Sequence, residues 1–466
     1  MLSRRRHGWE AGMDEGSEGR FSAYVEGLVE VIGHADRAGP LRDYCLGLLL
    51  PVERKSVEPL AAVTAPDRVS AQHQSLLHFV ANAAWSDERL LARVRELVLP
   101  SIERSGPIEA WIVDDTSFPK QGKHSVGVAR QYCGERGKQE NCQAAVSLSI
   151  ANHGASLPVA YRLYLPEAWA ADPERRAKAG VPEETGFATK PAIALAAIRA
   201  ARAAGIPPGT VLMDAGYGVD ERLRRGIGGL GLAYVAGVLP TITLWPAQRP
   251  CVRAEVRHAR ALARALPPSA WERVAWREGS NDWLCSRYAR LRVRTAHAGR
   301  GAPGEEEWLL IDWPEDAPEP AGYWLSTLPA DIDLRAMVDR TQLRWRIERD
   351  YQELKQELGL GHYEGRGWRG FHHHASLCIA AYGFLVSERE TIPPSAPHSA
   401  PRRPQPAVPP HRPRRNAPDP SRAPRAQLNR DTPPTPHRRI GQDPPTMSLL
   451  PGSKSKTKHQ ATLVTQ

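Results

Sequence analysis

Three acidic residues stand at positions from which their side chains could hold metal ions. Asp115 follows an apolar run, and Asp214 ends a second run over Thr210–Met213. Glu348 lies in a segment of helical periodicity. Carboxylates at the ends of sheet strands project where the sites of α/β proteins are commonly built. Three such groups repel one another unless a cation neutralises them, and several oxygen ligands suit Mg²⁺ or Mn²⁺. Two such ions would activate a water and stabilise the leaving oxygen of a phosphodiester.

The first of these positions has two candidates, because Asp114 directly precedes Asp115. Neighbouring residues of a strand face opposite sides of the sheet, so only one of the two can be the ligand. An Asp at the end of a strand is also a common turn residue or helix cap. Neither Asp115 nor Asp214 is therefore specific when it is taken alone.

The segment around Glu348 predicts one long helix from about Leu334 to Leu358, with Gly359 as its stop. Arg344, Glu348 and Lys355 are four and seven residues apart, so they would form one stripe along it. A solvated row of ion pairs gives the same spacing. The apolar face that would pack on a sheet consists of Leu343, Ile347, Tyr351, Leu354 and Leu358.

The elements that must position these residues alternate in type after residue 106. The pattern predicts a helix over 191–204 and a mixed α/β sheet covered by helices. Residues 240–322 contain six tryptophans and strand-like stretches, which predict a β-rich insertion before a strand resumes at 323–328. The other strands are expected at 110–113, 143–151, 157–163, 210–213 and 232–238.

Two flanking regions differ from this central part. Residues 18–105 have helical periodicity and predict an N-terminal helical domain with a possible role in DNA binding, and Ser86 is a candidate helix cap. Residues 389–466 are rich in Pro and Arg and predict a disordered tail. From Thr391 onward the chain has 13 Lys and Arg against 3 Asp and Glu, which equals the whole net charge of +10. Any DNA binding by the rest must therefore come from local patches.

A Gly- and Lys-containing loop is expected over 120–138. Its cations Lys120, Lys123 and Arg130 are candidates for a second DNA-binding surface, although a solvated loop has the same composition. Tryptophans of the insertion could stack on an unpaired base, but packing in the core explains them equally. Adjacent histidines on a helix point in different directions, so His372–His374 do not favour a metal site.

Bulk features restrict the class of protein. No apolar stretch is long enough to span a bilayer and no signal peptide is recognisable, so we expect no membrane association. The six cysteines show no C-x-x-C spacing, which favours a reducing compartment over a zinc site or redox pair.

The Arg344–Lys355 segment resembles the signature of insertion-sequence DDE transposases, Tyr-x2-Arg-x3-Glu-x6-Lys. Arg344, Glu348 and Lys355 match three of its four positions, and Thr341 stands where the Tyr is expected. Asp115-Thr116 resembles the first acidic motif of that family, and Asp214-Ala-Gly-Tyr217 resembles the second. The resemblance covers roughly residues 20–388.

This resemblance implies a ribonuclease-H-like catalytic domain in two parts, 106–239 and 323–388. Asp115, Asp214 and Glu348 would hold two Mg²⁺ ions, with Mn²⁺ as a possible substitute. Asp115 is preferred to Asp114 because Thr116 follows it. Arg344 and Lys355 would contact DNA phosphates near the cut end.

The implied activity is transposition: the enzyme cuts the ends of an insertion sequence and joins them to target DNA. Its partners would be double-stranded DNA with terminal inverted repeats and a second copy of the chain, in the bacterial cytoplasm at the nucleoid. One alternative is an inactive DNA-binding relic of such an enzyme. Another is a hydrolase with a carboxylate pair, such as a glycosidase, which would not explain Arg344 and Lys355 beside Glu348.

Overall fold

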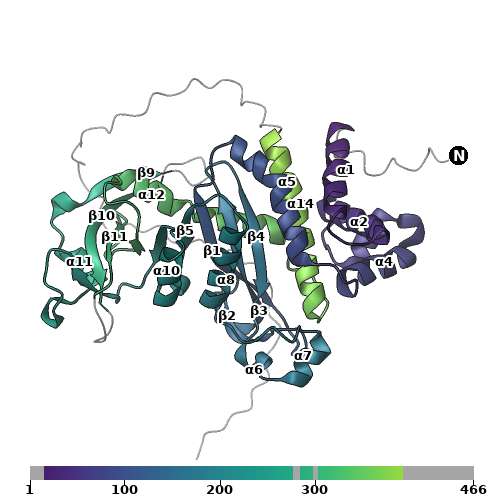
Figure 1. The fold of residues 1–466 in the computed structure, drawn as a ribbon, viewed down its shortest axis with the longest axis horizontal. Helices are drawn as coiled ribbons and strands as arrows, with labels where there is room; N and C mark the ends of the chain where they lie inside the picture. The colour runs from purple at the N-terminus through teal and green to yellow at the C-terminus, as the bar shows by residue number, and fades with distance from the viewer. Residues whose placement is uncertain (1–14, 277–283, 297–302, 392–466) are drawn as a thin grey trace, which may run out of the picture. The chain divides into compact units, whose positions relative to one another are not determined.

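The computed structural model describes residues 15–276, 284–296 and 303–391 (Figure 1). Its first part is helical, as predicted, and Ser86 caps the last of these helices by accepting a hydrogen bond from the backbone N–H of Arg89 at 3.1 Å. The predicted tail lies outside the described residues from 392 onward. The N-terminal helices are α1 (Glu15–Val29), η1 (Ala35–Arg37), α2 (Ala38–Leu49), α3 (Val57–Thr64), η2 (Pro66–Arg68), α4 (Val69–Ala81) and α5 (Asp87–Arg104).

A mixed sheet of 12 strands, mainly antiparallel, follows these helices. Strand β1 (Ala110–Pro119) lies between β3 (Lys138–Ala151), which is antiparallel to it, and β5 (Thr210–Met213), which is parallel. Strand β6 (Tyr234–Gly237) pairs in parallel with β5, while β2 (Ala129–Cys133) and β4 (Ser156–Leu163) pair with β3. This arrangement is consistent with a ribonuclease-H-like fold. The predicted loop over 120–138 is interrupted by β2, and β3 starts at its last residue, so the prediction is confirmed only for 120–128 and 134–137.

Short helices connect these strands. The Ala-rich helix α8 starts one residue before the predicted 191, where the Thr189 hydroxyl accepts a hydrogen bond from Ala192 N–H. The connecting helices are α6 (Glu167–Ala170), α7 (Pro173–Ala179), α8 (Lys190–Ala203), α9 (Ala215–Gly218) and α10 (Glu221–Gly228).

The described residues of the 240–322 region extend the same sheet. They hold strands, as predicted, and also one α-helix that the sequence pattern did not indicate. Strand β12 (Gly322–Ser326) then pairs antiparallel with β6, so the sheet is continuous across the insertion. The elements of the insertion are β7 (Thr243–Pro246), η3 (Arg253–Glu255), β8 (Arg257–His258), α11 (Ala259–Ala265), η4 (Pro268–Ala270), β9 (Glu272–Trp276), β10 (Leu284–Thr295) and β11 (Glu306–Trp313).

The prediction of one continuous helix over 334–358 is wrong at two points. Helix α12 (Leu334–Gln342) stops before Arg344, and α13 (Trp345–Gln352) begins after it. The π-helical segment η5 (Glu353–Glu357) then replaces the last α-helical turn. Gly359 has a φ of +66° and ends the segment as expected.

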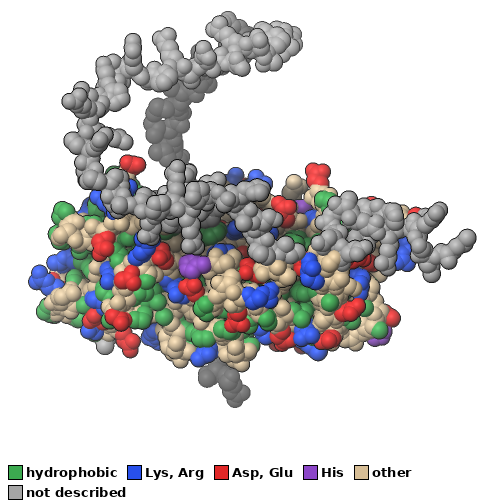
Figure 2. Space-filling view, turned by 90° about the horizontal axis from the view of Figure 1, so that it is seen from above, with side chains coloured by type: hydrophobic (Ala, Val, Ile, Leu, Met, Phe, Trp, Pro, Cys, Tyr) green, Lys and Arg blue, Asp and Glu red, His purple; other side chains and the backbone are tan. Residues whose placement is uncertain are grey.

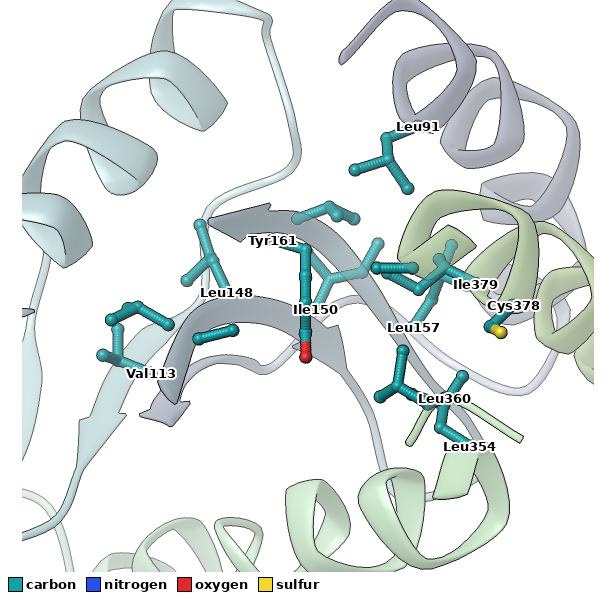
Figure 3. Packing of buried hydrophobic residues seen from close by; sticks show 14 of the residues in the cluster. Leu91, Val113, Leu148, Ile150, Leu157, Tyr161, Leu354, Leu360, Cys378 and Ile379 are labelled. Atoms are coloured by element: carbon teal, nitrogen blue, oxygen red, sulfur yellow. The ribbon is translucent and has the colours of Figure 1, made fainter. Parts of the chain in front are cut away.

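Two hydrophobic cores lie on the two faces of the sheet. The first contains Val113 and Met213 with the N-terminal helices, α8 and the long helix α14 (Trp368–Thr391). Figure 3 shows part of it, where Ile150 and Tyr161 of the sheet face Ile379 of α14. The second contains Ile112, Leu212 and residues of α12 and α13. The predicted apolar face of the Glu348 helix is divided between them, with Leu343 and Ile347 in the second core and Leu354 and Leu358 in the first.

Acidic and basic side chains are intermixed on the face drawn in Figure 2, with no large region of one sign. This mixture matches the balanced charge of the chain before Thr391. Among the residues that the structure describes, no helix is long and apolar enough to cross a membrane.

Candidate active site

The two predicted strand-end carboxylates come from neighbouring parallel strands. Val113 of β1 pairs with Met213 of β5, so Asp114 and Asp214 come directly after two paired residues. Strand β1 continues to Pro119, however, so the prediction that Asp115 ends its strand is wrong. Strand β5 is a buried run of four residues, as is typical of parallel strands covered on both faces. Asp214 then caps α9 by accepting a hydrogen bond from Tyr217 N–H at 3.2 Å.

Asp114 and Asp115 have different partners on the two faces of β1. Asp114 Oδ2 accepts a hydrogen bond from Arg344 at 3.2 Å, on the face covered by α13. Asp115 Oδ2 lies 2.7 Å from Lys190 Nζ at the start of α8, and its Oδ1 accepts a hydrogen bond from the Tyr217 hydroxyl at 3.1 Å. The structure thus separates the two neighbours as strand alternation predicts, and it places Asp114 on the side of Glu348.

The electrostatic setting of Asp114 differs from that of a paired surface carboxylate. Burial raises the pKa of Asp114 to about 7. The Arg344 guanidinium opposes this rise, and the charges of Asp214 and Asp115 add to it. A cation bound beside such a buried carboxylate would neutralise the neighbouring negative charge. It would therefore stabilise the ionised form of Asp114.

Arg344 connects Asp114 to Glu348. It lies at the break between α12 and α13, and its guanidinium donates to Asp114 and, at 2.7 Å, to Glu348 Oε1. The Glu348 side chain is 65% exposed. It can therefore change its conformation without disturbing the core. Arg344 occupies the space between the two carboxylates as an internal cation.

Lys355 does not continue this row of ion pairs. Its Nζ donates to the backbone oxygen of Ser117 at 2.8 Å and to Glu135 Oε2 at 2.8 Å. The break at Arg344 and the π-helical segment change the direction in which residue 355 projects. The expected stripe of three residues is therefore reduced to the pair Arg344–Glu348, with Lys355 attached to the end of β1.

Comparisons with known proteins bear on the same residues. The family model described as "DDE superfamily endonuclease" matches residues 27–283, which is more than half of the chain. This chain belongs to the DDE superfamily of endonucleases. The match includes Asp114, Asp115 and Asp214 and ends before α12, so it does not extend to Glu348.

One curated relative is described as "Probable transposase for insertion sequence element IS701" from Microchaete diplosiphon. It is 24% identical over 325 residues, which cover 68% of this chain and 76% of the relative. The aligned length is greater than the part of the chain that matches the DDE endonuclease family.

DDE endonucleases generally use divalent metals such as Mg²⁺. In this chain, the described residues contain no group of three or more His, Cys, Asp or Glu side chains close enough to hold an ion together. The donor chemistry nevertheless fits, because Asp114 and Asp214 follow paired residues of adjacent strands and supply hard oxygen atoms. Burial is the main cause of the raised pKa of Asp114, and the charge of Asp214 adds to it. Glu348 is ion-paired with Arg344 and does not form a common group of ligands with Asp114 and Asp214.

The other residue that the family resemblance singled out is Thr341, at the position of the signature Tyr. Thr341 is buried in α12, and its hydroxyl donates to the backbone oxygen of Met337 at 2.7 Å. Its side chain is therefore part of the helix packing in this DDE endonuclease, and it presents no aromatic ring to the site.

The three predicted cations of 120–138 lie in different settings. Lys120 donates to the backbone oxygen of Tyr363 at 3.1 Å, and burial lowers its pKa. Lys123 and Arg130 are exposed, and Arg130 lies on the previously unpredicted strand β2. Lys120 therefore has a structural contact, while the other two are accessible to a ligand.

Sequence reasoning missed Lys190 as a residue of the site. The signal for it was the Thr189-Lys-Pro start of α8, which marks a helix N-terminus. Only the tertiary structure, in which α8 packs on β3 and β4, shows that Lys190 at this N-terminus reaches Asp115.

Proposed function

We propose that this chain is the transposase of an insertion sequence, which cuts the ends of its element and joins them to target DNA. The observation that carries this proposal is the arrangement of Asp114 and Asp214 on adjacent parallel strands, opposite the Arg344–Glu348 pair. It occurs in a chain of the DDE endonuclease family whose curated relative is described as a probable transposase.

The metal-holding set that we propose is Asp114, Asp214 and Glu348, which revises the sequence-based preference for Asp115. Asp114 shares a face of the sheet with α13, whereas Asp115 is bound by Lys190 and Tyr217. Divalent cations held there would activate the attacking oxygen and stabilise the leaving oxygen. Asp115 would act as a positioning residue, because Tyr217 links it to the cap formed by Asp214.

Two phosphoryl transfers would occur at this site. In the first, water attacks the phosphorus at the element end, the bond from phosphorus to the 3′ oxygen breaks, and that oxygen takes up a proton. In the second, the freed 3′-hydroxyl loses its proton and attacks a phosphodiester of target DNA, which releases a target 3′-hydroxyl. Arg344 and Lys355 would contact phosphates near the cut, because arginine and lysine donate well to phosphate oxygens. If Arg344 contacted a phosphate in place of Glu348, the Glu348 carboxylate would become available to hold a metal ion.

The partners that we propose are double-stranded DNA with terminal inverted repeats and a second copy of the chain, since both element ends must be held together. Arg344, Glu348 and Lys355 would form the Tyr-Arg-Glu-Lys signature, with Thr341 as its departure. Inverted repeats in the DNA just outside the gene would support this assignment.

The test is cleavage of DNA that carries the flanks of this gene, with and without Mg²⁺. Wild-type protein should nick the DNA only with Mg²⁺, and Glu348→Gln should lower the rate by about 10³-fold or more. Glu357→Gln is the matched control, because Glu357 is an exposed glutamate of the π-helical segment that follows α13. Equal nicking by wild type and Glu348→Gln contradicts the mechanism. DNA binding without any nicking by wild type indicates an inactive relic.

A further inference from the structure

A hollow of about 450 Å³ lies beside the candidate active site. Its walls come from β2, the turn after β4, the start of α8 and the residue Gly216 of α9. Its volume falls within the range of small-molecule sites, roughly 300–1,000 Å³. The ten residues that line it are Ala129, Arg130, Gln131, Tyr132, Tyr164, Pro166, Thr189, Lys190, Pro191 and Gly216.

The hollow directly adjoins Asp214. Gly216 lines it, and a Cβ atom added to Gly216 would lie 3.2 Å from Asp214 Oδ1. Lys190 lines it as well and is ion-paired with Asp115 at 2.7 Å. Anything bound in the hollow would therefore be next to Asp115 and Asp214.

One wall presents an unusual aromatic side chain. Tyr132 is 59% exposed, whereas most large hydrophobic side chains in the described part of the chain are buried. It is two residues from Arg130, so both project from the same face of β2. Gln131 points the other way and donates to the backbone oxygen of Cys142. A ring that is more than half exposed is available for stacking.

The charge of the lining is positive. Arg130 and Lys190 are its charged residues, and none of the ten is acidic. In the described residues, Arg130 has no ion pair with a carboxylate, and the start of the 14-residue helix α8 adds a partial positive charge. Cations and a helix N-terminus around an exposed ring complement a nucleotide, in which a flat base carries a phosphate.

We infer that this hollow receives one unpaired nucleotide of the DNA strand that the carboxylates cut, with its base stacked on Tyr132 and its phosphate facing Arg130. The inference rests on the proposed function and adds to it the place of the nucleotide next to the cut bond. Base stacking would then take place at Tyr132 and not in the insertion, because the described tryptophans of the insertion are buried or half-buried.

The experiment is a binding cycle that requires no cleavage. Tyr132→Ala and Tyr132→Phe are compared with wild type on duplexes from the flanks of this gene, without Mg²⁺. Each duplex has one abasic site at a different position around the element end. On intact DNA, Tyr132→Ala should bind about 10- to 100-fold more weakly, because stacking of one base is lost, and Tyr132→Phe should bind like wild type. At one abasic position the difference between wild type and Tyr132→Ala should disappear, since no base remains there to stack.

Arg130→Gln should weaken binding and reduce the salt dependence by about one phosphate contact. Its matched control is Arg202→Gln, because Arg202 is exposed at the other end of α8. All variants should melt at the wild-type temperature, since the changed side chains are on the surface.

Two results would overturn the inference. One is an equal effect of Tyr132→Ala on intact DNA and on every abasic duplex, or no effect at all. The other is a loss with Tyr132→Phe as large as that with Tyr132→Ala, which would assign the effect to the hydroxyl. Failure of the proposed function is recognised separately, because it requires that wild type does not nick DNA with Mg²⁺.

Discussion

Asp114 and Asp350 are two buried carboxylates whose pKa burial raises, yet their neighbours give them different roles. The pKa of Asp114 rises to about 7, and its surroundings include Arg344, Asp214 and Asp115. The pKa of Asp350 rises to about 6, and its Oδ1 accepts hydrogen bonds from the hydroxyls of Ser156 and Tyr382.

The difference shows that a raised pKa does not by itself identify a reactive site. Neutral hydroxyl donors from β4 and α14 make Asp350 an anchor for α13, which also carries Glu348. Like charges around Asp114 leave negative charge for a cation to neutralise. A change of Asp114 should therefore lower activity, and a change of Asp350 should lower stability.

Asp114→Asn should have the largest effect on activity. We expect Mg²⁺-dependent nicking of the flanking DNA to fall by about 10³-fold or more, because the change removes one carboxylate of the metal-holding set that we propose. The melting temperature should stay the same or rise, since a buried charge beside like charges is removed. Nicking rates and thermal unfolding on the same preparations check both parts.

Asp115→Asn is the control for that variant. Its loss of activity should be smaller, because the contacts of Asp115 with Lys190 and Tyr217 position other residues. If Asp115→Asn is the more damaging change, the first ligand is Asp115 and the proposed set is wrong.

Asp350→Ala should have the largest effect on stability. The change leaves the buried hydroxyls of Ser156 and Tyr382 without their acceptor, so the free energy of unfolding should fall by about 3 kcal/mol. Urea unfolding measures it. Asp350→Asn keeps one acceptor oxygen and should lose less, and equal losses from both variants would mean that the hydrogen bonds are not what stabilises α13.

The pH dependence of stability should reveal the same carboxyl group. Because its pKa is raised from 3.8 to about 6 in the folded state, the folded protein holds the Asp350 proton more tightly than the unfolded chain does. The contribution of this group to the free energy of unfolding is fully present below about pH 4, and it is lost as the pH rises through about 6. Across that range, wild type should lose about 2 kcal/mol of unfolding free energy relative to Asp350→Asn, which has no group that titrates at this position. A constant difference from pH 4 to pH 7 would contradict the raised pKa.

Lys355→Gln should have the smallest effect. It removes one positive charge at the end of β1, so DNA affinity should fall several-fold and the slope of its salt dependence should decrease by about 0.9. Fluorescence anisotropy at several salt concentrations measures both. Lys178→Gln, at an exposed position of α7, is the control and should leave the slope unchanged.

The sequence predicted those parts of the site that are local. The apolar runs before Asp114 and Asp214 form buried strands that pair in parallel. Such strands are recognisable in a sequence as short, continuous apolar runs. The choice between Asp114 and Asp115 could not be made this way, because it depends on which face of the sheet α13 covers. The sequence motif favoured Asp115, and the contacts favour Asp114.

The break at Arg344 was not predictable for a related reason. Leu343 and Arg344 are good helix formers, and the helical periodicity continues through them. Leu343 and Ile347, on the two sides of the break, both pack in the second core, and the change to the first core comes only at Leu354 in the π-helical segment. No pattern in the sequence marks either position. Strand β2 was missed because it is short and lies between glycine-containing turns. Lys190 belongs to the site through a contact between elements that are 75 residues apart in sequence.

The π-helical segment Glu353–Glu357 also affects how this chain is aligned with its relatives. A π-turn carries one residue more than the α-helical turn that it replaces. Deleting that residue would restore a regular α-helical turn and leave the residues beyond it facing in the same direction. The seven-residue spacing from Glu348 to Lys355 therefore does not measure a position on one uniform helix. A homologue with a six-residue spacing could bring its lysine to the end of β1 through a regular α-helix, so a one-residue gap here would not indicate a lost site.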